Sequence, residues 1–353
     1  MNILVTGGSG FIGSNLIRYL IDNSKYNVAN IDNLSYAGNL NNLDYLENNR
    51  RYKFFNVNII EKEQINEIVD TFEPNIVIHL AAESHVDRSI DNPEEFIKTN
   101  IFGTFTLLEV CRKFWQRTNY DKNFRFIHIS TDEVFGDLSF EDLPFSEENP
   151  YNPSSPYSAS KASSDHLARA WYRTFGFPVI VTNCSNNYGP YQFPEKLIPI
   201  TILRALNEEP IQVYGDGGQI RDWLHVDDHV NAIFSIIHNG KIGESYNIGA
   251  NEEKRNIEIV EIICSTLDKL APRKKVKIKK YSELITFVED RAGHDLRYAI
   301  NSKKLCQELN WEPKHKFAES LEKTIVWYLN NLNWCDKSLE KSGYKNERLG
   351  LVK

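Results

Sequence analysis

Hydrophobic and polar positions along the first 185 residues follow two alternating periods. Short, nearly unbroken apolar runs are typical of buried strands, and longer stretches with apolar residues every three or four positions are typical of amphipathic helices. The apolar runs predict strands at residues 2–6, 26–32, 52–58, 75–82, 124–130 and 177–183. The longer stretches predict helices at residues 61–72, about 94–117 and about 157–175, and a further helix opened by the glycine-rich turn at 7–13. This alternation predicts parallel βαβ units.

The pattern changes after about residue 185, where short segments rich in Pro, Gly and Tyr predict a second lobe. Residues 225–240 and 244–249 are typical of one more helix and one more strand, which we expect to return to the sheet. The predicted fold class is α/β, a Rossmann-type doubly wound parallel sheet with a smaller, interleaved C-terminal substrate-binding lobe. We assign residues 1–185 and about 224–255 to the sheet domain. Residues 186–223 and 256–353 are assigned to the lobe.

The composition of the 353-residue chain, 41% hydrophobic and 25% charged, is that of a soluble globular protein. The N-terminus lacks the pattern of a signal peptide, and no apolar run approaches the roughly 20 residues of a membrane helix. Five scattered cysteines without a CxxC pair indicate a reducing cytoplasm and no metal site. The net charge of −7 argues against nucleic-acid binding. We interpret the one basic run, residues 272–280, as an exposed edge strand.

A glycine-rich turn, TGGSGFIG, lies between the first predicted strand and the first predicted helix. Gly7, Gly10 and Gly13 permit a tight turn and a close approach to a pyrophosphate, which the start of the helix attracts. Asp32, at the end of the second strand, can accept hydrogen bonds from an adenosine ribose and repels a 2′-phosphate. The cofactor is therefore predicted as NAD rather than NADP, and the sheet domain as the NAD-binding domain. A glycine turn without a ligand would leave Asp32 unexplained.

The segment YSASK places Tyr157 and Lys161 four residues apart, on one face of a predicted helix. A free tyrosine titrates at about pH 10, and a nearby cation favours the phenolate. Tyr157 can then exchange a proton with a substrate hydroxyl. A surface Tyr/Lys pair without function would have the same spacing, but the glycine turn favours the catalytic interpretation.

Several longer segments carry a resemblance to a known family. They are LAAESHVDRSI at 80–90, STDEVFG at 130–136, SPYSASKA at 155–162, NCSNNYGPYQFPEKLIP at 183–199, QIRDWLHVDDH at 219–229 and DRAGHDLRYAI at 290–300. From residue 2 to about 330 the chain resembles the extended short-chain dehydrogenase/reductases, and among them the nucleotide-sugar 4,6-dehydratases. The glycines and the Tyr/Lys pair are common to the superfamily, whereas the TDE triplet and DRAGHDLRYAI are far more selective.

The resemblance gives the two carboxylates after the strand at 124–130 a chemical role. It implies that Glu133 is the base for the proton on carbon 5 of the sugar, and that Asp132 is the acid for the hydroxyl leaving carbon 6. It also implies that Thr131 hydrogen-bonds the sugar near carbon 4 and Tyr157. Neighbours on an extended strand point to opposite faces, so the backbone must leave strand geometry near Asp132. Burial beside a second carboxylate raises a pKa, which would keep Asp132 protonated.

The resemblance further implies which residues surround the two ligands. Besides the three glycines and Asp32, the NAD site would contain Phe11, Ile12, Asn33, Ser35, Asn58, Ile59, Leu80, Ala81, Ala82, Ser84, Thr99, Tyr157, Lys161 and Asn187. The nucleotide-sugar site would contain Ser84, His85, Thr131, Asn186, Lys196, Leu197, Gln212, Tyr214, Arg221, Asn256, Arg291, His294 and Tyr298. Arg221 and Arg291 suit a pyrophosphate, because the guanidinium fork pairs with its oxygens. Asn58 departs from the usual Asp of the family, and we expect its amide to retain a weaker adenine contact.

The resemblance thus implies an NAD-dependent enzyme that converts dTDP-glucose to dTDP-4-keto-6-deoxyglucose and water. Carbon 4 would be oxidised, water eliminated across carbons 5 and 6, and the hydride returned to carbon 6. UDP-glucose stays open as the substrate. A 4-epimerase needs no acid and base at carbons 5 and 6, so the TDE triplet speaks against it. A non-catalytic NAD-binding scaffold would not need Tyr157 and Lys161. By family analogy we expect a homodimer.

Overall fold

The computed structural model describes residues 1–271 and 278–342, together with Tyr344 and Gly350. Its centre is a seven-stranded sheet in the order β10-β6-β5-β4-β1-β2-β3, with every neighbouring pair parallel. The strands are β1 (Asn2–Thr6), β2 (Asn27–Asp32), β3 (Tyr52–Asn56), β4 (Ile76–His79), β5 (Arg125–Thr131), β6 (Val179–Cys184) and β10 (Ser245–Ile248). Each overlaps its predicted run, and the doubly wound parallel sheet is confirmed.

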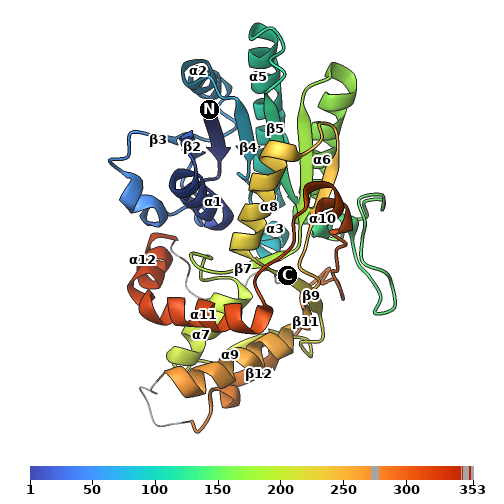
Figure 1. Cartoon of the computed structure of the whole chain (residues 1–353). Coiled ribbons are helices and arrows are strands. Elements are labelled where there is room, and N and C mark those ends of the chain that lie inside the picture. The colour runs from blue at the N-terminus through green and yellow to red at the C-terminus, as the bar shows by residue number, and fades with distance from the viewer. Residues whose placement is uncertain (272–277, 343, 345–349, 351–353) are drawn as a thin grey trace.

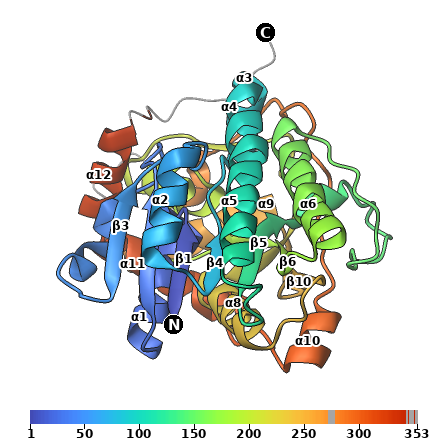
Figure 2. The same ribbon diagram turned by 90° about the horizontal axis from the view of Figure 1, so that it is seen from above.

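Helices cover both faces of this sheet, because its strands are apolar on both sides (Figure 1, Figure 2). One layer consists of α1 (Phe11–Asn23) and α8 (Val226–Asn239), and the other of α2 (Lys62–Phe72), α5 (Thr104–Arg117) and α6 (Pro156–Phe175). Successive residues of β1 alternate between the two cores. Ile3 and Val5 pack in the core with α1, and Leu4 packs in the core with α2.

The helix predicted at about 94–117 contains an irregular turn. It begins as α4 (Pro93–Phe96), passes through a π-helical turn at Ile97–Gly103 and continues as α5. A π-helical turn holds about one residue more than an α-helical turn. The side chains around it therefore point in directions that differ from those of a regular α-helix.

A second region lies beside the carboxyl ends of the large sheet (Figure 1). Its strands β7 (Asn186–Tyr188), β9 (Ile220–His225) and β11 (Glu253–Arg255) form one small sheet, and β8 (Ile211–Tyr214) pairs with β12 (Ile285–Val288). Its helices are α7 (Leu197–Leu206), α9 (Asn256–Leu270), α11 (Phe317–Asn330) and α12 (Leu332–Ser342). Ile202, Ile263 and Leu321 are fully buried where these helices meet.

The chain returns to the large sheet after β9, through α8 and β10. Ser245 of β10 pairs with Val181 of β6 at the edge of the sheet. The following α10 (Lys303–Leu309) also packs on this side, since Leu305 and Leu309 join the core formed by α1 and α8. Part of the segment assigned to the smaller lobe thus completes the core of the larger domain.

Two further observations concern the sequence predictions. Of the predicted edge strand at 272–280, residues 272–277 lie outside the described residues, and residues 278–280 form no strand. Among the described helices, none combines the length and the apolar character that crossing a bilayer requires.

Candidate active site

The crevice at the carboxyl ends of β1 and β4 is where the direction of winding changes. From β1 the chain runs outward through β2 and β3, and from β4 it runs the other way through β5, β6 and β10. Doubly wound sheets bind ligands at such a switch point. Gly7 follows β1 with φ +72°, and a Cβ on it would lie 2.6 Å from the backbone nitrogen of Ala81. A Cβ on Gly13 would lie 2.3 Å from the carbonyl oxygen of Gly7. Both positions therefore require glycine.

The start of α1 is open to an anion. Gly10 is its N-cap residue and offers no side chain to the first-turn N–H groups. These groups and the helix dipole suit a phosphate or pyrophosphate. The cradle thus fits the dinucleotide expected from the glycine spacing.

Asp32 stands at the other side of this cradle. Its Oδ2 accepts a hydrogen bond from the N–H of Ser9 at 2.9 Å, and its Oδ1 accepts one from the N–H of Leu34 at 2.8 Å. Burial raises the pKa of Asp32, and these two hydrogen bonds oppose the rise. Each carboxylate oxygen keeps a second lone pair, so Asp32 can still accept from a ribose hydroxyl.

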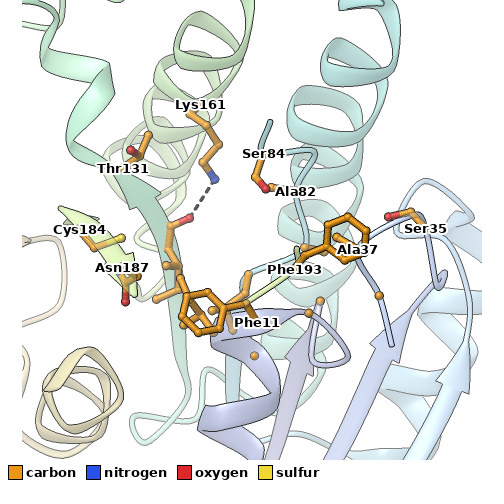
Figure 3. Close-up of a pocket in the computed structure, with 18 of the residues that line it drawn as sticks. Phe11, Ser35, Ala37, Ala82, Ser84, Thr131, Lys161, Cys184, Asn187 and Phe193 are labelled. Atoms are coloured by element: carbon orange, nitrogen blue, oxygen red, sulfur yellow. Dashed lines mark hydrogen bonds between the residues drawn. The ribbon is translucent and has the colours of Figure 1, made fainter. Parts of the chain in front are cut away.

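One cavity of about 300 Å³ joins the glycine turn to the ends of β5 and β6 (Figure 3). The predicted cofactor residues that line it are Gly7, Gly10, Phe11, Ile12, Gly13, Asp32, Asn33, Ser35, Ile59, Leu80, Ala81, Ala82, Ser84, Tyr157, Lys161 and Asn187. The predicted catalytic residues Thr131, Asp132 and Glu133 line the same cavity, as do Asn186 and Lys196 from the predicted substrate set. Cofactor and substrate residues therefore share one space.

Asn58 and Thr99 lie outside the wall of this cavity. The Oδ1 atom of Asn58 accepts from the N–H of Ile60 at 3.2 Å, so this side chain closes its own turn. Asn100, the neighbour of Thr99, reaches the segment after β4, where its Oδ1 accepts from the N–H of Glu83 at 2.9 Å. Thr99 and Asn100 both lie in the π-helical turn, where side chains point in directions that differ from those of a regular α-helix.

The backbone leaves strand geometry immediately after Thr131. Asp132–Phe135 form a 3₁₀ turn, and Thr131 Oγ1 caps it by accepting from the N–H of Glu133 at 3.3 Å. Thr131 Oγ1 also donates to Oδ1 of Asp132 at 3.3 Å. Both carboxyl groups consequently line one cavity, and the predicted departure from strand geometry is confirmed.

The two carboxyl groups differ in their electrostatic surroundings. The pKa of Asp132 is raised well above its usual value by burial and, next, by the charges of Glu133 and Asp222. Burial also raises the pKa of Glu133, but the positive charges of Arg291 and Arg221 oppose the rise. Of the two carboxyl groups, Asp132 is therefore the one whose surroundings more strongly favour the protonated form, as the acid of the pair requires.

Tyr157 and Lys161 reach the cavity from the first turns of α6. Lys161 Nζ donates to the backbone carbonyl of Ile129 at 2.9 Å, shown as a dashed line in Figure 3. The pKa of Tyr157 is raised well above its usual value by burial and by the charge of Glu133, while a hydrogen bond with Thr131 opposes the rise. This is opposite to the direction predicted from Lys161 alone. The physical reason is that burial removes water from the phenolate, which disfavours its charge.

Positive side chains gather at the Glu133 end of the cavity. Lys196 lines it, and Arg221 and Arg291 lie close enough to act on the Glu133 carboxylate. The guanidinium of Arg221 lies over the ring of Tyr298, 4.3 Å from its centroid. Arg291 Nε is buried and has no partner among the described residues, as expected of a donor aimed at an anionic ligand. This end therefore suits a diphosphate.

The other predicted substrate residues lie outside the cavity wall. His85 Nε2 is 3.9 Å from a carboxylate oxygen of Glu195, which does line the cavity. Tyr214 and His294 pair edge to face, with ring centroids 6.1 Å apart. Leu197 and Asn256 begin α7 and α9, and Gln212 is exposed on β8.

Glu195 lines the cavity but was not among the site residues predicted from the sequence. Its Oε2 accepts from Arg88 Nε at 3.1 Å, Tyr36 hydrogen-bonds it, and its Oε1 is buried without a partner among the described residues. It lies in the segment NCSNNYGPYQFPEKLIP, whose prolines and glycine interrupt the hydrophobic periodicity by which a buried position could be predicted. The other lining residues that were missed are Ile31, Tyr36, Ala37, Gly38, Val57, Ile129, Ser130, Cys184, Ser185, Gln192 and Phe193.

One group of possible metal ligands exists among the described residues, away from the cavity. Donor atoms of His225, Asp227 and His315 lie within 4.8 Å of one another. The two histidine rings are stacked, with centroids 4.2 Å and planes 22° apart. Their lone pairs lie in the ring planes and so do not converge on one point. We assign no metal to this group.

The Tyr157/Lys161 pair beside a dinucleotide cradle is the arrangement of a short-chain dehydrogenase/reductase. The positive side chains near the Glu133 end of the cavity suit a diphosphate, which indicates a nucleotide-sugar substrate. Comparison with known proteins narrows this class. Residues 4–324 match the GDP-mannose 4,6 dehydratase family, and the chain belongs to it. The resemblance inferred from the sequence motifs is confirmed.

Similar proteins cover almost the whole chain. A dTDP-glucose 4,6-dehydratase of Neisseria meningitidis serogroup B is 55% identical over 353 residues, which is 99% of each chain. The crystal structure of a dTDP-glucose 4,6-dehydratase of Bacillus anthracis in complex with NAD has a TM-score of 0.84 at 44% identity, and covers 96% of this chain and 99% of that one. A dTDP-glucose 4,6-dehydratase of Streptomyces venezuelae with NAD bound has a TM-score of 0.86 at 39% identity, with 96% and 100% covered.

Proposed function

We propose that the protein converts dTDP-glucose to dTDP-4-keto-6-deoxyglucose and water, as an NAD-dependent 4,6-dehydratase of the hydro-lyase class. Relatives of that name match it at 55% identity over 99% of the chain, and similar structures contain NAD. One observation carries the proposal. Asp132 and Glu133 line the same buried cavity as Tyr157 and Lys161.

Each of these side chains has one task in the proposed reaction. Tyr157, supported by Lys161, takes the proton from the hydroxyl on carbon 4. Glu133 then removes the proton from carbon 5, which the new ketone has made acidic. Asp132 gives its proton to the hydroxyl that leaves carbon 6. When bound, NAD⁺ would supply the acceptor for the hydride of carbon 4 and, once reduced, the source of the hydride for carbon 6. Glu133 returns its proton to carbon 5 in that last step.

The substrate-binding roles stay proposals for individual residues. Arg221, Arg291 and Lys196 would hold the diphosphate, because Lys196 lines the Glu133 end of the cavity and the charges of both arginines act on the same end. The division into an NAD-binding domain and a nucleotide-sugar-binding lobe follows the same logic, since the glycine turn lies in one and Arg291 in the other.

Product analysis tests the function. The protein is incubated separately with dTDP-glucose and UDP-glucose, and the products are examined by mass spectrometry. We expect loss of one water from dTDP-glucose and little change in UDP-glucose. Equal conversion of both would show a broader specificity. Epimerised hexose without loss of water would replace the dehydratase with an epimerase.

We also propose a homodimer, supported by apolar side chains on the outer surface of two adjacent helices. Phe102 in the π-helical turn and Phe105 at the start of α5 are 59% and 42% exposed, and Phe175 at the end of α6 is 44% exposed. Figure 2 shows α5 and α6 side by side on the outside of the sheet. Such a patch suits a second copy of the same surface.

A charge placed in this patch should separate the protomers. Phe102→Glu would bury two carboxylates across the symmetric contact, so we expect the dimer to weaken by at least about tenfold. Phe140→Glu is the matched control, because Phe140 is also 59% exposed but lies in the loop before α6. Sedimentation measurements distinguish the two. A monomeric parent protein, or a dimer equally unaffected by both changes, would contradict the proposed interface.

We further propose a cytoplasmic location, supported by five cysteines that are all free. Cell fractionation that recovered the protein outside the cytoplasm would overturn it.

A further inference from the structure

A buried carboxylate lies one helical turn beyond Lys161 on α6. Tyr157, Lys161 and Asp165 are spaced four residues apart and share one face of the helix. Their exposed fractions are 8%, 4% and 0%. Asp165 does not line the cavity, so any effect on the reaction must pass through other residues.

Hydrogen-bond donors hold Asp165 from three sides. Its Oδ1 accepts from His128 Nε2 at 3.0 Å, and its Oδ2 accepts from the hydroxyl of Tyr151 at 2.9 Å and from Asn183 Nδ2 at 3.2 Å. Burial alone would raise the pKa of Asp165, but its hydrogen bond with His128 contributes to a net lowering. Burial keeps His128 neutral by lowering its own pKa. Asp165 is therefore a buried anion held by neutral donors.

Lys161 is a buried cation in need of a counter-charge. Its ammonium donates a hydrogen bond to a neutral carbonyl, that of Ile129. Burial lowers the pKa of Lys161, and Asp165 is the first group that opposes this. Among the described residues, the titratable groups that interact electrostatically with Lys161 are Asp165 of α6, His128 of β5, His79 of β4 and Cys184 of β6. Tyr157 lies one helical turn before it on the same face of α6.

Asp165 is the one member of this set that is negative at neutral pH. Burial lowers the pKa of both histidines, which keeps them neutral. It raises the pKa of Cys184 to about 12 and that of Tyr157 well above its usual value, so neither is charged in the resting site, and Tyr157 is negative only once it is deprotonated to act as the base. A buried ammonium without an opposite charge tends to lose its proton.

We propose that Asp165 is a positioning residue for the oxidation at carbon 4, whose buried carboxylate keeps the Lys161 ammonium charged beside Tyr157. It also braces the end of β5, because Asn183 Nδ2 donates both to Asp165 and to the backbone carbonyl of Thr131 at 3.1 Å. The inference rests on the proposed function, since it assigns Lys161 a part in the first oxidation.

The negative charge of Asp165 predicts the direction in which the pH dependence of the first oxidation changes when it is removed. Lys161 must be protonated to support Tyr157, so the rate of the first oxidation falls as pH rises through the pKa of Lys161. Asp165→Asn removes the anion that supports this proton. We expect the alkaline limb of the profile to move to lower pH by about 1–3 units.

Two readouts on the intact protein test this. Single-turnover formation of enzyme-bound NADH from dTDP-glucose is followed across the pH range. Independently, the titration of Lys161 is followed by NMR of protein labelled at the lysine ε-carbon, with Lys161→Met identifying the signal. Tyr151→Phe is the matched control, because it removes one hydrogen bond to the same carboxylate and keeps the charge. Its alkaline limb and its Lys161 titration should match those of the parent.

An unmoved Lys161 titration in Asp165→Asn, or an equal shift in Tyr151→Phe, would overturn the proposal. If Asp165→Asn does not fold, Asp165→Glu and Tyr151→Phe decide, since both keep the charge and alter the packing. If the alkaline limb of the pH profile is unchanged in both variants, the proposal is supported. A shift of that limb in either variant means that packing, and not the charge of residue 165, sets its position. A parent protein that forms no NADH from dTDP-glucose would refute the proposed function, and the NMR titration would still test the Asp165–Lys161 interaction.

Discussion

Glu133→Gln should still form enzyme-bound NADH from dTDP-glucose, yet eliminate water about 10²–10⁴-fold more slowly. The change removes the base for carbon 5 and keeps the shape and hydrogen-bonding capacity of the side chain. The charge of Glu133 also raises the pKa of Tyr157, so its removal should let NADH form at lower pH than in the parent. Rapid-quench mass spectrometry separates oxidation from elimination, and solvent deuterium at carbon 5 should enter far more slowly.

Asp132→Asn should slow elimination in the same range, because it removes the acid at carbon 6. Exchange at carbon 5 can continue in this variant, since Glu133 remains. Glu147→Gln provides the control: Glu147 is a partly buried carboxylate that accepts from the N–H of Asn247 at 2.9 Å, away from the cavity. Elimination at the parental rate in both cavity variants would make the carboxylates bystanders and would remove Glu133 and Asp132 from the proposed chemistry.

Tyr157→Phe should lower the rate of the first oxidation by about 10²–10⁴-fold while leaving dTDP-glucose binding nearly intact. The ring stays in place beside Phe96, with centroids 6.3 Å apart, and only the ionisable hydroxyl is lost. Single-turnover NADH formation measures the rate, and equilibrium titration measures the binding.

Tyr246→Phe removes a partly buried hydroxyl elsewhere, one that donates to Glu308 at 3.0 Å. It should leave the rate of NADH formation close to that of the parent. Parental NADH formation in Tyr157→Phe would remove this residue from the proposed chemistry. A loss of dTDP-glucose binding to match the loss of rate would make it a binding residue instead.

The large sheet could be predicted because its signals are local. Each strand is a short apolar run, and a doubly wound order follows from the alternation with helices. The 3₁₀ turn at Asp132 could also be anticipated, because two adjacent carboxyls cannot face one ligand from an extended strand. The need for both carboxyl groups at one ligand and the alternation of side chains on a strand thus both predicted a change of backbone at Asp132.

Features that depend on long-range packing were not predictable in this way. Glu195 meets Arg88 and Tyr36 across more than a hundred residues of chain, and nothing in its own loop marks it as buried. The π-helical turn was not predicted either, because hydrophobic spacing does not reveal one extra residue per turn. The pKa of Tyr157 rises through burial, which the spacing to Lys161 could not indicate.

The return of β10 to the sheet has a consequence for how the chain is made. β6 is complete at Cys184, but its outer neighbour begins at Ser245. Until residues 185–244 have been synthesised, the hydrogen-bonding groups along one side of β6 have no partner strand. At a general rate of about 5–20 residues per second, this interval lasts on the order of 3–12 seconds. Through that time an open apolar edge is exposed to pairing with other nascent chains. The sheet therefore gains its last strand only after the segment that builds part of the proposed sugar site has been synthesised.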